Sequence, residues 1–179
     1  DWIYAVGLDS SELGNPPSKF QKVFKKASEL GFITVAHAGE EGPAEYIWEA
    51  INLLDVKRID HGNKCLSDES LVNHLAEHQI PLTLCPLSNL ELKVITNMAD
   101  YPLVEMMNKG LLVTINSDDP AYFGGYMNEN FLAVAESLNL NHNQLAELAD
   151  NGIKSSWMNE DQKLKHQMKV KEVLNSFQQ

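Results

Sequence analysis

Five short apolar segments recur along the chain, and each is followed by polar residues. The segments are residues 2–8, 32–38, 58–62, 80–86 and 110–116. Most of them are almost continuously apolar, which is typical of parallel strands that are buried on both faces. The pattern therefore predicts five strands at these positions.

Helical patterns fill the intervals between these segments. The first predicted helix follows a Pro-Pro pair and stops before Gly31, because proline favours the first turn of a helix and glycine its end. The predicted helices are residues 17–30, 43–54, 68–79, 102–109, 127–138, 142–153 and 160–177. The last is amphipathic and lysine-rich, so it is predicted to be a surface or docking helix. Strands that alternate with helices predict βαβ units and a parallel sheet, which is an α/β fold.

At or just beyond the end of each apolar segment lies a residue whose side chain can act in catalysis or bind a metal. These residues are Asp9, His37, His61, Cys85 and Asp118. The carboxyl ends of parallel strands meet on one face, which in a (β/α)8 barrel is the active-site face. Five strands form either an open sheet or part of such a barrel, which typically takes about 250 residues. The chain starts inside an apolar stretch and without Met, so residues 1–179 are predicted to be the C-terminal part of one (β/α)8 TIM-barrel domain, strands 4–8, with extra C-terminal helices.

Composition excludes several classes of partner. The formal net charge is −11, which disfavours nucleic acid or an anionic membrane as a partner. No apolar run approaches the roughly 20 residues of a membrane-spanning helix, and no signal peptide opens the chain. The two cysteines, Cys65 and Cys85, are too few for a disulfide framework and suit a reducing compartment. A cytoplasmic location is therefore predicted.

Three of the strand-end motifs suggest a metal-assisted reaction. In "VAHAGE", His37 is a candidate zinc ligand and Glu40 a candidate proton donor. In "RIDHG", His61 could steer a catalytic water, and in "NSDDP", Asp118 could bind zinc while Asp119 faces a substrate. Imidazole nitrogen and carboxylate oxygen are ligands that zinc accepts, and a cation would offset the repulsion between two adjacent carboxylates.

Purely structural roles are the main alternative. One strand-end histidine is usually structural, and an aspartate before proline often starts a turn, but three such motifs in phase favour a site. His74 and His78 have metal-ligand spacing but no H-E-x-x-H pattern, so they are predicted to be solvated. Cys85 is predicted to be a buried thiol, and Ser88 and Asn89 to line the mouth of the pocket.

The motifs "HAGE", "HG", "CPLSN" and "SDDP" occur in the order and spacing of the adenosine/adenine deaminase family, which the chain resembles along its whole length. The family consists of zinc hydrolases with a (β/α)8 barrel. The resemblance implies that His37 and Asp118 bind zinc and that Glu40 protonates the purine ring at N1. It implies that His61 orients and polarises the water that zinc binds, and that Asp119 hydrogen-bonds the purine at N7. Glu40 then has to be protonated at neutral pH, so burial is expected to raise its pKa.

Two departures from the family pattern matter. The H-x-H pair that supplies two more zinc ligands is absent, and it is expected upstream of residue 1. Members that act on nucleosides carry Asp-Leu-Ala-Gly-Asp-Glu after the fourth strand, whereas this chain has "GLDSSELG", with Ser10 where the purine-contacting glycine would align. This stretch and "SDDPAYFGGYMNENF" resemble the adenine deaminase branch.

The resemblance implies a function in purine salvage, the zinc-dependent hydrolysis of adenine to hypoxanthine and ammonia. Two alternatives stay open: an adenosine deaminase, and a fragment or degenerate domain that has lost the metal. Deaminases with a P-C-x-x-C zinc signature are excluded, because that signature is missing. The 179-residue chain on its own is expected to be inactive, to bind zinc weakly and to self-associate through open barrel edges.

Overall fold

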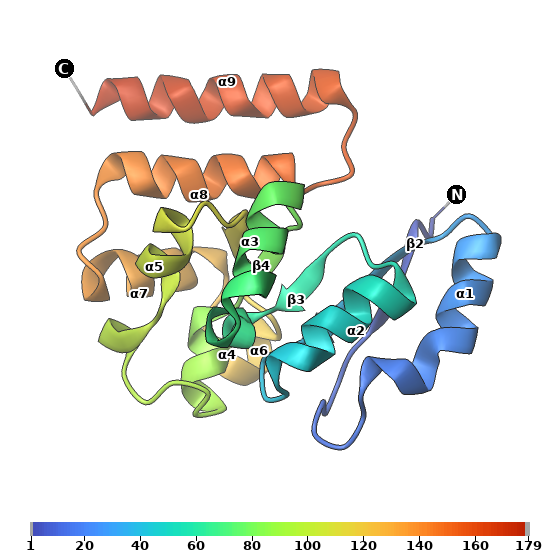
Figure 1. The fold of residues 1–179 in the computed structure, drawn as a ribbon. Coiled ribbons are helices and arrows are strands. Elements are labelled where there is room, and N and C mark those ends of the chain that lie inside the picture. The colour runs from blue at the N-terminus through green and yellow to red at the C-terminus, as the bar shows by residue number, and fades with distance from the viewer. Residues whose placement is uncertain (1, 178–179) are drawn as a thin grey trace. The chain divides into compact units, whose positions relative to one another are not determined.

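The computed structural model describes residues 2–177, in which strands and helices alternate (Figure 1). Its strands are β1 (Ala5–Leu8), β2 (Ile33–Ala38), β3 (Ile59–His61), β4 (Leu82–Leu84) and β5 (Val113–Ile115). Each predicted segment contains one of them, so the strand predictions are confirmed, although every strand is shorter than its apolar segment.

The predicted helices are also present, and four short helical segments were missed. The α-helices are α1 (Gln21–Glu29), α2 (Ala44–Leu54), α3 (Glu69–His78), α4 (Pro86–Glu91), α5 (Leu103–Asn108), α6 (Pro120–Phe123), α7 (Met127–Ser137), α8 (His142–Lys154) and α9 (Glu160–Ser176). The 3-10 helices are η1 (Pro17–Phe20), η2 (Asn63–Ser67) and η3 (Met98–Asp100). The missed segments, η2, α4, η3 and α6, have three to six residues each, which is too short for a helical period to show in the sequence.

The strands lie in the sheet in the order of the chain, β1-β2-β3-β4-β5. The pairs β1–β2, β2–β3 and β3–β4 are parallel. A doubly wound sheet reverses its strand order at a switch point, whereas a (β/α)8 barrel adds each strand beside the one before it. The observed order is that of the barrel, and the predicted α/β fold with a parallel sheet is confirmed.

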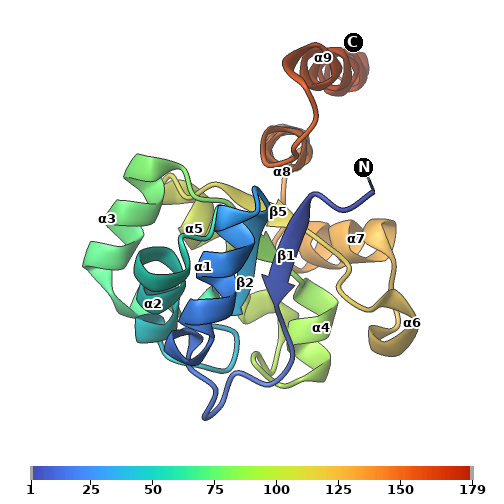
Figure 2. The ribbon, with the colours of Figure 1, turned by 90° about the vertical axis from the view of Figure 1, so that its right-hand side faces the viewer.

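Two compact units make up the chain. The first consists of Asp1–Leu84 and Glu105–Leu111, and the second of Cys85–Val104 and Leu112–Gln179. In the first unit, α1, α2 and α3 lie on the same side of strands β1 and β2 (Figure 2). The fully buried side chains of these helices and of β3 and β4 include Ile47, Leu54, Ile59, Leu71 and Leu82.

Strand β1 departs from the sequence prediction. Its residues are half-buried or exposed, and the preceding Trp2, Ile3 and Tyr4 are exposed. It is the first strand in the sheet order, so β2 covers only one of its edges. Strand β2, which has neighbours on both sides, is largely buried as predicted. Burial on both faces therefore requires a complete set of neighbours, which an apolar sequence does not guarantee.

In the second unit, α8 and α9 lie side by side as a helical pair (Figures 1 and 2). Both begin with a capping box, in which Asn141 pairs with Gln144 and Asn159 with Gln162. Asn151 of α8 donates a hydrogen bond from Nδ2 to the carbonyl oxygen of Val113, at 3.1 Å, and so ties α8 to β5. No residue of the described α9 is buried, which agrees with the predicted surface helix.

Among residues 2–177, none of the helices combines the length and the hydropathy that crossing a membrane would require.

Candidate active site

His37 belongs to a row of polar side chains that crosses three strands of the first unit. The register pairs His37 on β2 with Asp60 on β3, and Asp60 with Thr83 on β4. The Thr83 hydroxyl donates to Asp60 Oδ1 at 2.8 Å, and Nδ1 of His37 lies 3.6 Å from Asp60 Oδ2. Because neighbours in register point to the same face of a sheet, the fold places these three side chains in one row.

Asp60 is the fixed negative charge of this row. Burial by itself would raise its pKa, but His37, the guanidinium of Arg58 and the hydroxyl of Thr83 together outweigh burial and lower the pKa of Asp60 to about 2. Arg58 Nε lies 3.0 Å from Oδ1. The His37 contact is long for a hydrogen bond, so Arg58 and Thr83 are the better-defined partners. Asp60 therefore stays ionised at neutral pH and faces the His37 ring with a carboxylate.

His61 ends β3 in a left-handed backbone conformation, with φ at 64°. A histidine rarely adopts that conformation, and such strain concentrates at functional sites. In a regular strand, His61 and Asp60 would point to opposite faces. Instead, the His61 ring lies edge-on to that of His37, with centroids 4.7 Å apart. The turn at the end of β3 therefore brings both imidazoles to one place.

Glu40 is the third member of this cluster. Its carboxylate oxygen Oε1 lies 3.3 Å from Nδ1 of His61, and both side chains are buried. Glu40 stands two residues beyond β2, in a loop whose first residue, Gly39, has φ at 74° and accepts a hydrogen bond from the amide of Lys64. A buried carboxyl group next to a buried imidazole is a suitable pair for moving a proton.

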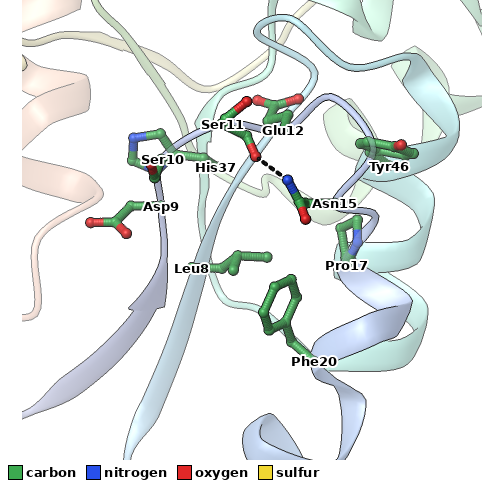
Figure 3. Close-up of a pocket in the computed structure, with 10 residues that line it drawn as sticks. All are labelled: Leu8, Asp9, Ser10, Ser11, Glu12, Asn15, Pro17, Phe20, His37 and Tyr46. Atoms are coloured by element: carbon green, nitrogen blue, oxygen red, sulfur yellow. Dashed lines mark hydrogen bonds between the residues drawn. The ribbon is translucent and has the colours of Figure 1, made fainter.

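The loop after β1 folds over a cavity of about 210 Å³ (Figure 3). Leu8 and Phe20 form part of its apolar wall, and Glu12 and His37 belong to its polar wall. Ser10, in the same loop, has φ at 72°. Glycine adopts that conformation most readily, so serine occupies it here under strain.

Asp118 and Asp119 lie in the second unit, just beyond β5. Both are exposed, and Asp118 has φ at 55°, again in the left-handed region. Asp119 occupies the N-cap position of the short helix α6, but its side chain makes no capping hydrogen bond. The roles of Asp118 and Asp119 in metal and substrate binding stay predictions.

The sequence predictions for the remaining polar residues had mixed outcomes. Cys85 is buried, as predicted, and His78 is exposed, as predicted. His74 is only half-buried and lies 5.0 Å, between ring centroids, from Trp48.

Ser88 and Asn89 were expected at the mouth of a pocket, and this prediction is wrong because both are fully buried in α4. Asn89 Oδ1 accepts a hydrogen bond from the Tyr101 hydroxyl at 3.0 Å. The side-chain amide of Asn89 is thus engaged in a buried hydrogen bond within the fold.

Sequence reasoning gave no role to two residues that organise this site. Asp60 is part of the "RIDHG" motif, and its spacing from Arg58 on the same strand face could have indicated the ion pair. Glu12 accepts hydrogen bonds from the amides of Gly39, Glu40 and Gly42. It lies in an irregular loop, where no periodicity predicts the contacts of a side chain.

The donor chemistry of His37 fits a metal ligand. A histidine that binds a metal through one ring nitrogen commonly presents the other to a carboxylate, which orients the ring. The carboxylate of Asp60 beside Nδ1 supplies this feature, so Nε2 is the nitrogen that would bind a metal. Imidazole and carboxylate donors are consistent with zinc.

Comparison with known proteins places most of the chain in one family. The family model for adenosine deaminase matches residues 1–173. A relative named adenine deaminase from Hahella chejuensis is 56% identical over 158 residues, which cover 88% of this chain and 47% of the relative. The chain thus spans about half the length of the curated relatives it matches.

Solved structures agree with this assignment. The crystal structure of adenine deaminase from Arthrobacter aurescens is 48% identical, with a TM-score of 0.95, and the match covers 97% of this chain and 53% of that one. An amidohydrolase from Burkholderia ambifaria, solved with bound zinc, is 27% identical, with a TM-score of 0.90 over 98% of this chain and 50% of that one.

Proposed function

Since the chain belongs to the adenosine deaminase family, we propose that the protein containing it hydrolyses adenine to hypoxanthine and ammonia, in purine salvage. The observation that carries the proposal is the buried pair of Glu40 and His61, 3.3 Å apart, beside the ring of His37. Relatives named adenine deaminase, such as the one that is 56% identical, support the free base as substrate. The chain then corresponds to strands 4–8 of the barrel.

In this proposal, His37 and Asp118 would be two of the ligands of a zinc ion, and further ligands would complete the site. Bound there, zinc would act as a Lewis acid that makes water nucleophilic at neutral pH. Asp60 holds the His37 ring in the orientation required for binding. The zinc found in the 27% identical amidohydrolase from Burkholderia ambifaria supports this choice of metal.

In the proposed reaction, Glu40 acts as the general acid and His61 as the general base. Glu40 donates a proton to N1 of adenine, which makes C6 electrophilic, and His61 orients the attacking water and takes up its proton. The oxygen of water forms the new C6–O bond. As the C6–N bond breaks, the remaining hydroxyl proton passes to the departing amino group, so that ammonia leaves and C6 keeps a carbonyl oxygen. The contact between the two side chains allows a proton to pass from His61 to Glu40 and so restores the starting state. Asp119 is proposed to hold the base through a hydrogen bond at N7.

The test is ammonia release by the complete protein with adenine and, in parallel, with adenosine. Adenine is expected to be turned over and adenosine to be a poor substrate. Equal turnover of both would favour the nucleoside deaminase, and no turnover of either by folded, zinc-loaded protein would favour the non-catalytic alternative.

The Glu40→Gln variant removes the proton donor and is expected to lower kcat by about 10² or more, the usual scale for a general acid. Unchanged kcat would remove Glu40 from its role.

For residues 1–179 alone, we propose inactivity, weak zinc binding and self-association. The exposed Trp2, Ile3 and Tyr4 lead into the edge strand β1, and an uncovered apolar edge invites pairing with another chain. Light scattering would show oligomers, and metal analysis would show zinc well below one ion per chain. A monomer with tightly bound zinc and enzyme-level turnover would contradict this part of the proposal.

We also propose a cytoplasmic location for the protein. The two cysteines, both free and buried, support it.

A further inference from the structure

Glu12 occupies an unusual position in the loop after β1. Among residues 9–15 it alone is buried, with 5% of its surface exposed, whereas its six neighbours in the loop are exposed. A glutamate is almost never buried to this extent unless its charge is matched by partners. In the part of the chain described, no lysine, arginine or histidine lies within ion-pair distance of it.

The partners of Glu12 are backbone amides of another loop. Oε2 accepts hydrogen bonds from the amides of Gly39 and Gly42, each at 2.9 Å, and Oε1 accepts one from the amide of Glu40 at 3.0 Å. One carboxylate thus binds three of the four successive residues that follow β2. Hydrogen bonds to a charged acceptor are about twice as strong as neutral ones.

The amino-acid choice in the second loop suits this arrangement. A Cβ atom at Gly42 would lie 2.5 Å from Glu12 Oε2, so only glycine lets the carboxylate approach the backbone this closely. Gly39 has φ at 74°, and a Cβ atom there would lie 2.5 Å from the side chain of Ile47. The contact with Glu12 therefore explains Gly42, whereas the backbone turn and the packing of Ile47 explain Gly39.

The bound loop carries the proposed acid. The backbone amide of Glu40 donates a hydrogen bond to Glu12, while Oε1 of the Glu40 side chain lies 3.3 Å from Nδ1 of His61. Apart from Glu12, the residues of the first loop from 9 to 15 are exposed, and several of them line the cavity beside Leu8 and Phe20 (Figure 3). The hydrogen bonds of Glu12 are thus the main tie between the two loops.

We propose that Glu12 is a positioning residue, which fixes the Glu40 loop through three backbone amides and so aims the Glu40 carboxyl group at the substrate. This inference rests on the proposed function for the role of Glu40. Glu12 itself touches neither the reacting atoms nor the proton that is transferred.

The experiment compares Glu12→Gln with Glu49→Gln in the complete protein. Glutamine keeps the size of the side chain but replaces one carboxylate oxygen with an NH2 group, which cannot accept from an amide. Glu49 is a matched control, because its Oε2 also accepts a backbone amide, that of Ser18 at 2.9 Å, in a segment without a proposed catalytic residue. Glu12→Asp keeps the charge and provides a milder variant if the glutamine variant folds poorly.

The first readout is hydrogen exchange at the amides of residues 39–42, which needs no activity. Glu12→Gln is expected to speed exchange there by about tenfold or more, the scale of one hydrogen bond to a charged group. Glu49→Gln is expected to leave these amides unchanged. Unchanged exchange in both Glu12 variants would overturn the positioning role, whether or not the protein deaminates adenine.

The second readout is the turnover of adenine. Glu12→Gln is expected to lower kcat at least about tenfold with little change in KM, and to have little further effect in a Glu40→Gln background, because both changes remove the same positioned acid. If Glu12→Gln lowers kcat by the same factor in the wild-type and in the Glu40→Gln background, the role of Glu12 is merely structural and the proposal is overturned. If the wild-type protein does not release ammonia from adenine, the proposed function fails, and the exchange measurement still decides the contact.

Discussion

Asp60 makes the stability of this fold depend on pH in a way that the structure quantifies. Its pKa is lowered from 3.8 to about 2, and its side chain is 16% exposed, so solvent screens its partners only in part. A shift of nearly two units corresponds to roughly 2 kcal/mol of stability, at about 1.4 kcal/mol per unit. Because the pKa is depressed in the folded state, this stability is present above pH 3.8 and is lost as the pH falls through about 2.

The Asp60→Asn variant isolates this contribution. At pH 6 the variant lacks the charge that binds Arg58 and faces His37, so it is expected to be less stable than the wild type by at least about 2 kcal/mol. The difference between the two proteins should shrink by about 1 kcal/mol by pH 3, since the unfolded wild-type chain takes up a proton at Asp60 below pH 3.8, at a higher pH than the folded protein does. Urea unfolding at pH 6 and pH 3, followed by tryptophan fluorescence, measures both differences.

A surface carboxylate provides the control. Asp55 lies 2.7 Å from the Lys57 ammonium group in an exposed ion pair, and asparagine tolerates its left-handed backbone. Asp55→Asn is therefore expected to change the stability by no more than about 1 kcal/mol at either pH. If the difference between wild type and Asp60→Asn is the same at pH 6 and pH 3, Asp60 is not a low-pKa group and the reasoning is refuted.

Three further predictions follow from the site and its surroundings. Asp118→Ala is expected to lower the zinc content of the complete protein, whereas Asp119→Ala should retain zinc and weaken transition-state binding by a few kcal/mol, because it removes a charged hydrogen-bond partner; equal loss of zinc in both, measured by metal analysis, would contradict this division. Burial raises the pKa of the Cys65 thiol to about 12, so Cys65 should resist iodoacetamide in the folded chain and react only in denaturant, as mass spectrometry of the labelled peptide would show. Gly42→Ala is expected to destabilise the fold by about 1–3 kcal/mol, since its Cβ would lie 2.5 Å from an aromatic carbon and a carboxylate oxygen. Gly152→Ala, in helix α8 with open space around it, should instead be neutral or stabilising in the same thermal melts.

The sequence by itself determined the elements and the ends of the strands. Runs of apolar residues and helical periods act over a few neighbours, so they placed β2 at "ITVAHA" and α3 at "ESLVNHLAEH" within one or two residues of their observed bounds. Strand ends also determined that His37 and His61 would meet, because the carboxyl ends of parallel strands share one edge of a sheet. The family motifs then indicated which catalytic roles to propose for these residues.

The tertiary structure decided how the site is held together. Asp60 meets Thr83 across 23 residues of sequence, and Glu12 meets the amide of Glu40 across 28. Such contacts depend on the register of neighbouring strands and on the course of two loops, and no local pattern encodes either. The left-handed turn at His61 likewise contradicts the alternation of its strand and persists because the surrounding packing imposes it. The sequence therefore identified the residues that could react, while the fold decided which side chains orient them, since orientation comes from partners that are distant along the chain.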